Sequence, residues 1–402
     1  MYLEKLRMDA YKKYKIAARQ YGTPYYLFEI KELRDRIQEI KRIAGSKMKL
    51  CYAVKANPFL VSYINDLVDK FEVCSPGEYT ICKKEKIDSA KIVLSGVYKE
   101  RREIEETLSD GFKGTYTLES KQQCALLYEL ARENNKMIHV LIRLTSGNQF
   151  GMNKEDIEEI MDDSKYSQYF IIEGIHYYSG TQKKHSMIEK ELNEILDFCN
   201  HLEQRYNKSI SKLEYGPGLY IDYFGSAIEG FSEIRYLSKQ LEKLSGQMEV
   251  TIELGRYIAA LCGKYVTRVV DTKKNQNINY AITDGGIHQL GYHGQMLGMK
   301  FPRVSIIYNT SKERIRESWM ICGALCTVQD VLLKNFETET LQTGDFIIFH
   351  DVGAYAMTDT NVLFLSRDLP LVLVENTDGV MECIRKRIQS VTFNIRNSEG
   401  GL

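Results

Sequence analysis

The chain has 402 residues, of which 44% are hydrophobic and 27% are charged, with 54 basic and 54 acidic side chains. A net charge of zero argues against a protein dedicated to nucleic acid or to membrane surfaces. No apolar run reaches the length that crosses a bilayer, whereas the chain is long enough for two domains with full cores.

The N-terminal residues 1–20 are charged throughout, which predicts an amphipathic helix and not a signal peptide. The nine cysteines lack paired spacing, so free thiols and a cytoplasmic location are expected. Cys322 and Cys326 lie four apart without a second pair, so no metal site is predicted. Residues 23–29 predict a strand, and its expected partner is the second domain.

From residue 48 to residue 256, short apolar runs alternate with longer amphipathic stretches. This alternation predicts a parallel sheet, and eight repeats favour a closed (β/α)8 TIM barrel. The alternative is an open doubly wound sheet, which normally carries a glycine-rich turn after its first strand; here that turn is Lys55-Ala56-Asn57-Pro58. The predicted strands are 48–55, 71–75, 91–95, 114–118, 137–144, 171–178, 212–215 and 249–254.

After Arg256 the pattern changes to β-rich runs joined by short turns, which predicts a second, antiparallel β domain. The expected domains are a barrel over residues 27–257 and a β domain made of residues 1–26 plus 258–402. The predicted strands of the β domain are 264–270, 278–283, 304–308, 319–325, 345–349, 362–365, 371–375 and 380–384.

Lys55 ends the apolar run 50–54, directly before a proline turn. A lysine that leaves an apolar wall is desolvated, and burial favours the neutral amine. A neutral amine is a nucleophile that forms a Schiff base with an aldehyde. The alternative is a lysine that caps the strand and extends its ammonium group to water.

The predicted strand ends carry further polar groups, and in a barrel these ends meet at the catalytic rim. Together they suit a phosphorylated aromatic aldehyde, because glycine turns and an arginine can bind phosphate and a carboxylate can hold a pyridine nitrogen protonated. The alternatives are a plain Gly-Pro-Gly turn, an ordinary Glu253–Arg256 ion pair and a core histidine at His176. The rim residues are Lys55, Glu72, Arg143, His176, Tyr178, Thr181, Gly216, Gly218, Glu253 and Arg256.

With these residues in place, the chain resembles the fold-type III pyridoxal-phosphate decarboxylases, which include the diaminopimelate, ornithine and arginine decarboxylases. The resemblance runs from about residue 23 to about residue 357 and implies a barrel plus a β domain of the alanine racemase and ornithine decarboxylase type. It rests on five motifs in the family's order: Tyr52-Ala53-Val54-Lys55-Ala56-Asn57, Glu72-Val73-Cys74-Ser75-Pro76-Gly77-Glu78, Glu253-Leu254-Gly255-Arg256, Cys326-Thr327-Val328-Gln329-Asp330 and Gly353-Ala354-Tyr355.

The resemblance implies an amino-acid decarboxylase with pyridoxal 5'-phosphate as cofactor and Lys55, Glu253 and Cys326 as catalytic residues. Lys55 would bind the cofactor as a Schiff base, and Glu253 would pair with its pyridinium nitrogen. Cys326 would return a proton to the substrate carbon across a homodimer interface, so that two subunits share each active site. The other expected cofactor contacts are Glu72, Arg143, Tyr178, Thr181, Gly216, Gly218, Gly255, Arg256 and Tyr355, and the expected substrate contacts are His176, Thr327 and Tyr355.

Several positions depart from the family pattern and bear on the substrate. Tyr178 replaces the usual ring-stacking histidine, and Pro217 removes one N–H donor from the phosphate turn. Thr327 replaces a carboxylate that helps to hold the distal amine of diamino acids, and a neutral hydroxyl cannot supply that charge.

These departures argue against a diamino-acid substrate. The runs 174–182 and 284–288 and the Cys326-Thr327 pair look like a biosynthetic branch that includes the butirosin-pathway glutamyl-carrier-protein decarboxylase. The expected reaction is therefore decarboxylation of an amino acid or an amino-acid conjugate in a specialised pathway, with a carrier-tethered substrate included. The alternatives are a diaminopimelate or ornithine/lysine decarboxylase of primary metabolism, and a catalytically dead homologue that only binds a partner.

Overall fold

The computed structural model describes residues 2–46, 48–207, 210–225, 230–242, 248–310 and 313–396, with side chains from residue 11 onward. The predicted first residue of the N-terminal helix lies outside this part of the chain. The described residues fall into two compact units: Arg34–Ile221 with Glu229–Ile258, and Met1–Leu33 with Asp222–Ile228 and Ala259–Leu402.

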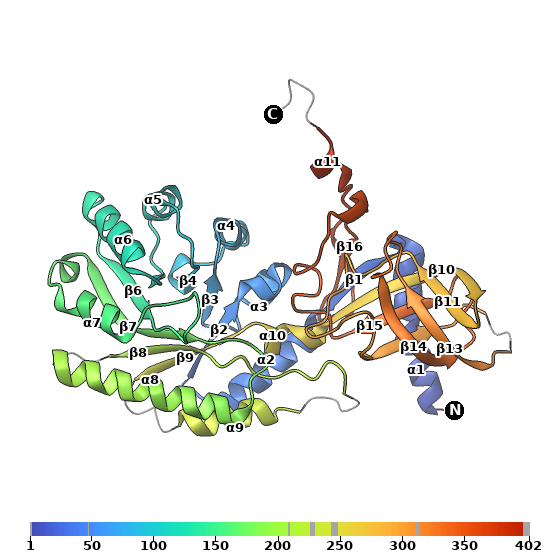
Figure 1. Ribbon diagram of the computed structural model, residues 1–402, viewed down its shortest axis with the longest axis horizontal. Coiled ribbons are helices and arrows are strands. Elements are labelled where there is room, and N and C mark those ends of the chain that lie inside the picture. The colour runs from blue at the N-terminus through green and yellow to red at the C-terminus, as the bar shows by residue number, and fades with distance from the viewer. Residues whose placement is uncertain are drawn as a thin grey trace. The chain divides into compact units, whose positions relative to one another are not determined.

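The first unit contains a closed parallel barrel of eight strands, as the alternating pattern predicts (Figure 1). Parallel pairing continues around the whole ring, and β2 pairs with both β3 and β9. The strands are β2 (Met48–Ala53), β3 (Lys70–Val73), β4 (Ile92–Leu94), β5 (Thr115–Leu118), β6 (Ile138–Arg143), β7 (Phe170–Tyr178), β8 (Lys212–Gly216) and β9 (Glu249–Leu254).

Helix α2 precedes the first barrel strand and a helix follows each of the eight strands, and helices such as α4 to α9 lie outside the ring (Figure 1). Several begin with a side-chain cap: Ser75 accepts from the Glu78 amide at the start of α4, and Ser120 accepts from the Gln123 amide at the start of α6. The helices are α2 (Ile30–Ala44), α3 (Val61–Ile64), α4 (Pro76–Lys84), α5 (Arg101–Ser109), α6 (Lys121–Glu133), α7 (Lys154–Asp162), α8 (His185–Tyr206), α9 (Ser232–Leu241) and α10 (Arg256–Ala259).

The strand register places chemically important residues at the same level of the barrel. Arg143 lies opposite His176, and His176 lies opposite Glu214 on the next strand. The next strand around the ring, β9, pairs with β8 and also with β2, where Cys51 lies opposite Glu253. The barrel therefore gathers charged side chains from strands that are far apart in the sequence.

The second unit is built on one sheet of nine strands. The strand predicted at 23–29 is β1, and it pairs within this unit with β10 and β16. The elements are α1 (Tyr2–Tyr21), β1 (Tyr25–Glu29), β10 (Gly263–Asn275), β11 (Ile278–Thr283), β12 (Val304–Ile307), β13 (Arg316–Cys322), β14 (Val331–Glu339), β15 (Phe346–His350), β16 (Leu371–Glu375), β17 (Met381–Arg385) and α11 (Val391–Asn394).

Three details of the predicted β domain were wrong. The sheet is mixed and not purely antiparallel, because β1 runs parallel to β16 and β11 runs parallel to β13. The strand β14, which pairs with β13, was missed. The apolar run 362–365 is not a strand; its Leu363, Phe364 and Leu365 are exposed, and a short 3-10 turn begins at Phe364.

The sheet packs against helix α1 through an apolar core. Tyr14 and Ala17 of α1 contact strand residues in this core. The core residues alternate along β1 and β16, because every second side chain of a strand points to the same face of a sheet. The strand members of the core are Tyr25, Leu27, Val266, Ile307, Ile348, Leu371 and Leu373. Among the helices in the described part of the chain, none is long and apolar enough to span a membrane.

Candidate active site

The turn that carries Lys55 is built by its own neighbours. Strand β2 ends at Ala53, so Lys55 lies in the 3-10 turn Val54–Ala56 just beyond the strand. The buried Asn57 closes this turn, because its amide donates to the Val54 carbonyl and its side chain accepts from the Phe59 amide. These contacts fix the direction in which the Lys55 side chain leaves the barrel wall.

Two buried carboxylates surround the amine of Lys55. Lys55 Nζ lies 3.0 Å from Glu72 Oε2 and 3.6 Å from Glu253 Oε1, and 5.5 Å from the centre of the Tyr178 ring. Burial alone would raise the pKa of Glu253, but Lys55 and His176 hold that pKa well below its usual range. Glu253 is therefore an ionised carboxylate inside the barrel.

His176 lies behind Glu253 and orients it. Its Nε2 is 3.1 Å from Glu253 Oε2, and since a carboxylate only accepts, Nε2 carries the proton. The structure thus gives His176, expected from the sequence as a substrate contact, a buried position at 1% exposure with Glu253 as its partner.

Glu214 completes a cluster with His176 and Glu253 that sequence reasoning missed. One ligand-type atom of each residue lies within 4.8 Å of the others. Burial, together with the charges of Glu253 and Glu72, raises the pKa of Glu214 to about 8. Glu214 is therefore a neutral acid near pH 7. In the sequence, the only hint of this role is that Glu214 is an acidic residue inside the predicted strand 212–215.

Arg143 reaches into the barrel from β6 and pairs with a second carboxylate. Its Nη1 donates to Glu119 Oε1 at 2.9 Å, and both side chains are buried. Lys99 lies nearby, and burial lowers its pKa to about 8, although Glu119 opposes that change. Neither Glu119 nor Lys99 was predicted from the sequence.

Two glycine turns at the ends of β7 and β8 pack against each other. A Cβ atom on Gly218 would lie 2.0 Å from the Gly180 carbonyl, and one on Gly216 would lie 2.5 Å from the Tyr178 ring. Gly218 also has φ of +57°, which favours glycine. Arg256 Nε donates to Thr181 Oγ1 at 3.3 Å beside these turns. The turns thus leave bare backbone next to a guanidinium group and a hydroxyl.

A buried ion pair supports the two turns from behind. Lys183 Nζ donates to Glu191 Oε2 at 2.8 Å and to the Gly216 carbonyl at 3.3 Å. Glu191 also accepts from Tyr215, at 2.7 Å, and from Ser179. This network, also missed from the sequence, links both turns to helix α8.

The remaining predicted residues lie in the second unit. Cys326 is exposed in the turn between β13 and β14, and Thr327 Oγ1 accepts from the Gln329 amide. Asp330 holds this turn, because its buried carboxylate accepts from the amides of Ile287 and Leu325. Tyr355 lies in another turn of this unit, with φ of +63°.

Most of the predicted site residues therefore meet at one end of the barrel. Gly255 lies there as well, since a Cβ on it would come within 2.9 Å of Ala56 Cβ in the Lys55 turn. The members of this barrel group are Lys55, Glu72, Arg143, His176, Tyr178, Thr181, Gly216, Gly218, Glu253, Gly255 and Arg256.

The donor set of the barrel group fits pyridoxal phosphate. Lys55 offers an amine for the aldehyde, and Glu253 offers an ionised carboxylate for a pyridinium nitrogen. The side-chain-free backbone at Gly216 and Gly218, with Arg256 beside it, offers N–H groups and positive charge for the phosphate.

Comparison with known proteins agrees with this chemistry. Residues 30–260 match the family described as pyridoxal-dependent decarboxylase, pyridoxal binding domain, and residues 256–353 match its C-terminal sheet domain. The chain belongs to the pyridoxal-dependent decarboxylases. It is thus a carboxy-lyase with pyridoxal phosphate as its cofactor.

Similar curated proteins carry several different substrate names. The L-glutamyl-[BtrI acyl-carrier protein] decarboxylase of Niallia circulans is 26% identical, over 92% of each chain. The 2-[(L-alanin-3-ylcarbamoyl)methyl]-2-hydroxybutanedioate decarboxylase of Staphylococcus aureus is 24% identical, over 88% of this chain and 94% of the relative. The diaminopimelate decarboxylase of Aquifex aeolicus is 27% identical, over 92% and 90%.

Solved structures share the fold. Diaminopimelate decarboxylase from Helicobacter pylori, complexed with L-lysine, superposes with a TM-score of 0.82 at 23% identity, covering 94% of this chain and 98% of that one. The corresponding enzyme from M. jannaschii superposes with a TM-score of 0.81 at 23% identity and 94% coverage of both chains.

Proposed function

We propose that this decarboxylase acts on an amino acid whose far end is joined to a larger group, such as a carrier protein, in a specialised biosynthetic pathway. The observation that carries the proposal is the neutral Thr327 directly after Cys326. The acid of the same turn, Asp330, is buried and committed to two backbone amides, so it is a poor partner for a distal ammonium. The relative from Niallia circulans, whose name includes a carrier protein, supports the same substrate class.

The proposed roles of the barrel residues follow from their contacts. Lys55 would hold the cofactor through its amine, and Glu72, 3.0 Å away, would take and return the Lys55 proton. Glu253, oriented by His176, keeps the pyridine nitrogen protonated. When bound, the cofactor supplies an aldehyde for the substrate amine and a cationic ring that accepts the electrons of the breaking Cα–carboxylate bond.

The remaining proposed roles concern binding. Gly216, Gly218, Thr181 and Arg256 hold the phosphate with Tyr355, and Tyr178 stacks on the ring. Arg143 and Gly255 complete the cofactor pocket, and Thr327 and Tyr355 face the substrate.

Cys326 is proposed as the acid that returns a proton to the substrate carbon, supplied by the other subunit of a homodimer. Residues 27–257 would form the cofactor domain, while residues 1–26 and 258–402 would form the β domain that contributes to the dimer interface. The enzyme is proposed to work in the cytoplasm, a reducing compartment that suits its nine free cysteines.

Mixing two inactive variants tests the shared site. Lys55→Ala and Cys326→Ala subunits, unfolded and refolded together in equal amounts, should recover up to about one quarter of wild-type turnover, because half the dimers are mixed and each has one intact site. Cys322→Ala, which changes a neighbouring thiol on β13, is the control and should stay active. If mixed dimers form but no activity returns, the shared-site proposal is contradicted. Either Cys326 and Lys55 of one site come from the same chain, or Cys326 is not the proton donor.

A substrate panel tests the substrate class. CO2 release should be measured with free glutamate, free diamino acids, and amino acids attached to a phosphopantetheine-bearing carrier protein. We expect the tethered substrates to be turned over with a kcat/KM at least about ten times that of any free amino acid. Efficient turnover of meso-diaminopimelate or ornithine would contradict the proposal.

The second candidate is a diaminopimelate or ornithine/lysine decarboxylase of primary metabolism. The diaminopimelate decarboxylase of Aquifex aeolicus, similar over most of its length, favours this reading. A catalytically dead homologue would fail a simpler test: the purified protein should be yellow, and borohydride should fix the cofactor to Lys55. A colourless protein that added pyridoxal phosphate does not label would support the dead homologue.

A further inference from the structure

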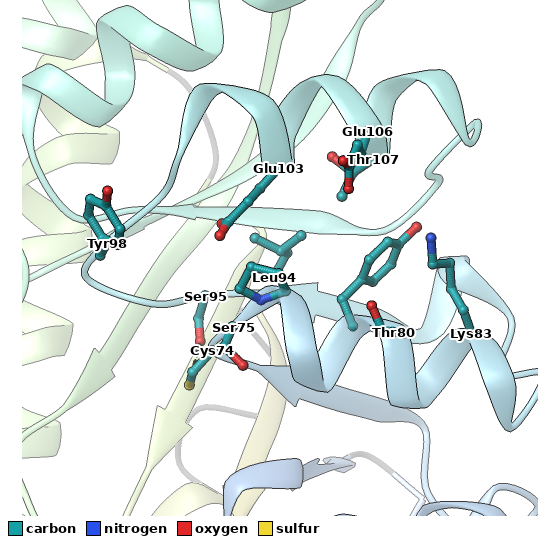
Figure 2. A pocket seen from close by; sticks show the side chains of 12 residues that line it. Cys74, Ser75, Thr80, Lys83, Leu94, Ser95, Tyr98, Glu103, Glu106 and Thr107 are labelled. Atoms are coloured by element: carbon teal, nitrogen blue, oxygen red, sulfur yellow. Dashed lines mark hydrogen bonds between the residues drawn. The ribbon is translucent and has the colours of Figure 1, made fainter. Parts of the chain in front are cut away.

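A small cavity lies beside the barrel where β3 and β4 end and helices α4 and α5 begin (Figure 2). Its volume is about 30 Å³, which is enough for one or two water molecules. Cys74 and Ser95 line its inner part, whereas Tyr98 and Thr80 are exposed residues of its lining. Glu103 of α5 also lines the cavity, which Figure 2 shows with its carboxylate directed toward it.

The inner wall of this cavity is hydrogen-bonded to the partner of Lys55. Ser95 Oγ donates to Glu72 Oε1, and Cys74 Sγ donates to the same oxygen at 2.8 Å. Glu72 in turn lies 3.0 Å from Lys55 Nζ. An unbroken chain of polar atoms therefore runs from the Lys55 amine to the cavity.

Cys74 and Ser95, the two residues between Glu72 and the cavity, each carry a proton that can be donated. Burial and the charge of Glu72 raise the pKa of Cys74 well above its ordinary value, so its sulfur stays a thiol. The Ser95 hydroxyl is 2% exposed and can accept from one neighbour while it donates to another. Cys74 Sγ and Ser95 Oγ are also 3.4 Å apart, so either can serve the other.

We propose that Glu72, Ser95 and Cys74 form a proton relay that connects Lys55 to water in this cavity. The proposal rests on the proposed role of Lys55. In the outward direction, the Lys55 ammonium loses one proton to a Glu72 carboxylate oxygen and recovers its lone pair. Ser95 or Cys74 then accepts that proton from Glu72 while passing its own proton to a cavity water. The inward direction reverses each transfer, so the relay ends with no net change in its members.

The relay matters because Lys55 must change its protonation state each time it takes up or gives back the cofactor. A path to the cavity beside α4 and α5 lets this proton exchange with water while a substrate lies over Lys55. The same oxygen of Glu72 also accepts from Lys55 Nζ, at 3.2 Å, so the amine and both relay donors meet on one atom.

Stopped-flow pH jumps on the purified holoenzyme test the relay, with the visible absorbance of the bound cofactor as the signal. We expect the relaxation after the jump to be about ten-fold slower in Ser95→Ala and slower still in the Ser95→Ala/Cys74→Ala double variant. The equilibrium midpoint of the same titration should stay near that of the wild type. Ser95→Cys should restore much of the rate, because a thiol can both accept and donate.

Thr80→Ala is the matched control, since it removes another hydroxyl from the cavity lining on α4. It should relax like the wild type. A wild-type relaxation rate in the double variant would overturn the relay, and so would a shifted midpoint with an unchanged rate, which indicates a static role for Ser95 and Cys74. A wild-type protein that never shows the cofactor's visible band would overturn the proposed function and the relay together.

Discussion

The two units of the chain use buried acids in opposite ways. In the sheet unit, Asp330 and Asp345 are fully engaged, because their oxygens accept from backbone amides and, in Asp345, from Arg314. In the barrel, Glu119 and Glu214 each keep one buried oxygen without a partner among the described residues. The bound oxygens of Asp330 and Asp345 hold turns, whereas the unpartnered oxygens of Glu119 and Glu214 lie among the charged groups of the candidate site.

The free-energy cost of burying a charge explains why every buried, ionised acid in both units needs partners, although the two units supply different ones. A buried charge is tolerated only when it is paired and hydrogen-bonded. The sheet unit meets this condition with the amides of its tight turns. The barrel meets it with opposite charges, such as Lys55 beside Glu72 and Glu253, and these are the groups that can exchange protons.

Lys55→Ala should produce the largest effect and should leave the fold intact. We expect turnover to fall by at least about 10³-fold, because the residue that carries the cofactor is lost. CO2 release and borohydride fixation measure this loss, and circular dichroism should show that the variant is still folded. Lys49→Ala, on the strand that precedes the Lys55 turn and paired with Glu249 at the surface, is the control. Substantial activity in Lys55→Ala would contradict the assignment of Lys55 as the residue that carries the cofactor.

Asp345→Ala should do the reverse and weaken the fold. Both Asp345 and its partner Arg314 are buried, at 0% and 3% side-chain exposure, so the change leaves an unpaired buried cation. The expected cost is about 3–5 kcal/mol of unfolding free energy. Chemical denaturation measures it, with the exposed Asp271→Ala as the matched control. A stable Asp345→Ala would mean that the turn acids are not structural.

Glu214→Gln should remove the contribution of this barrel acid to the pH dependence of the unfolding free energy. The pKa of Glu214 rises from 4.5 to about 8 on folding, so folding takes up a proton. The stability that this group contributes is full below about pH 4.5 and is lost as the pH rises toward 8.

Glutamine stays neutral at every pH. At pH 7.5 the variant should therefore gain on the order of 3 kcal/mol over the wild type. Unfolding curves from pH 4.5 to pH 8 measure the difference. An identical pH dependence in both proteins would show that Glu214 is ionised.

Lys183→Met should give the smallest effect, on cofactor binding. The ammonium of Lys183 supports the Gly216 turn and Glu191, and methionine keeps only the shape of the side chain. We expect cofactor affinity to fall about ten-fold, which matches the loss of one charge-assisted hydrogen bond. Equilibrium titration with pyridoxal phosphate measures it, and the exposed Lys184→Met is the control. Unchanged affinity would mean that the turns hold the phosphate site without this support.

The outcome for individual strands shows what a local pattern can predict. All eight barrel strands were found within a few residues, because buried parallel strands are short apolar runs separated by helices. Strand β14 was missed because several of its residues are exposed and polar. The run 362–365 was wrong for the opposite reason, since its apolar side chains lie exposed in a turn.

The sequence by itself determined the barrel, the position of Lys55 at a strand end and the choice of cofactor, since these follow from local apolar patterns and from short motifs that need no knowledge of which residues touch. Only the tertiary structure decided which charges meet. The register around the barrel brings Glu214 to His176 and Glu253, and the packing of two turns brings Lys183 to Gly216. These contacts join residues about 30 to 80 positions apart, and their pKa shifts arise from burial and proximity, which no local pattern encodes.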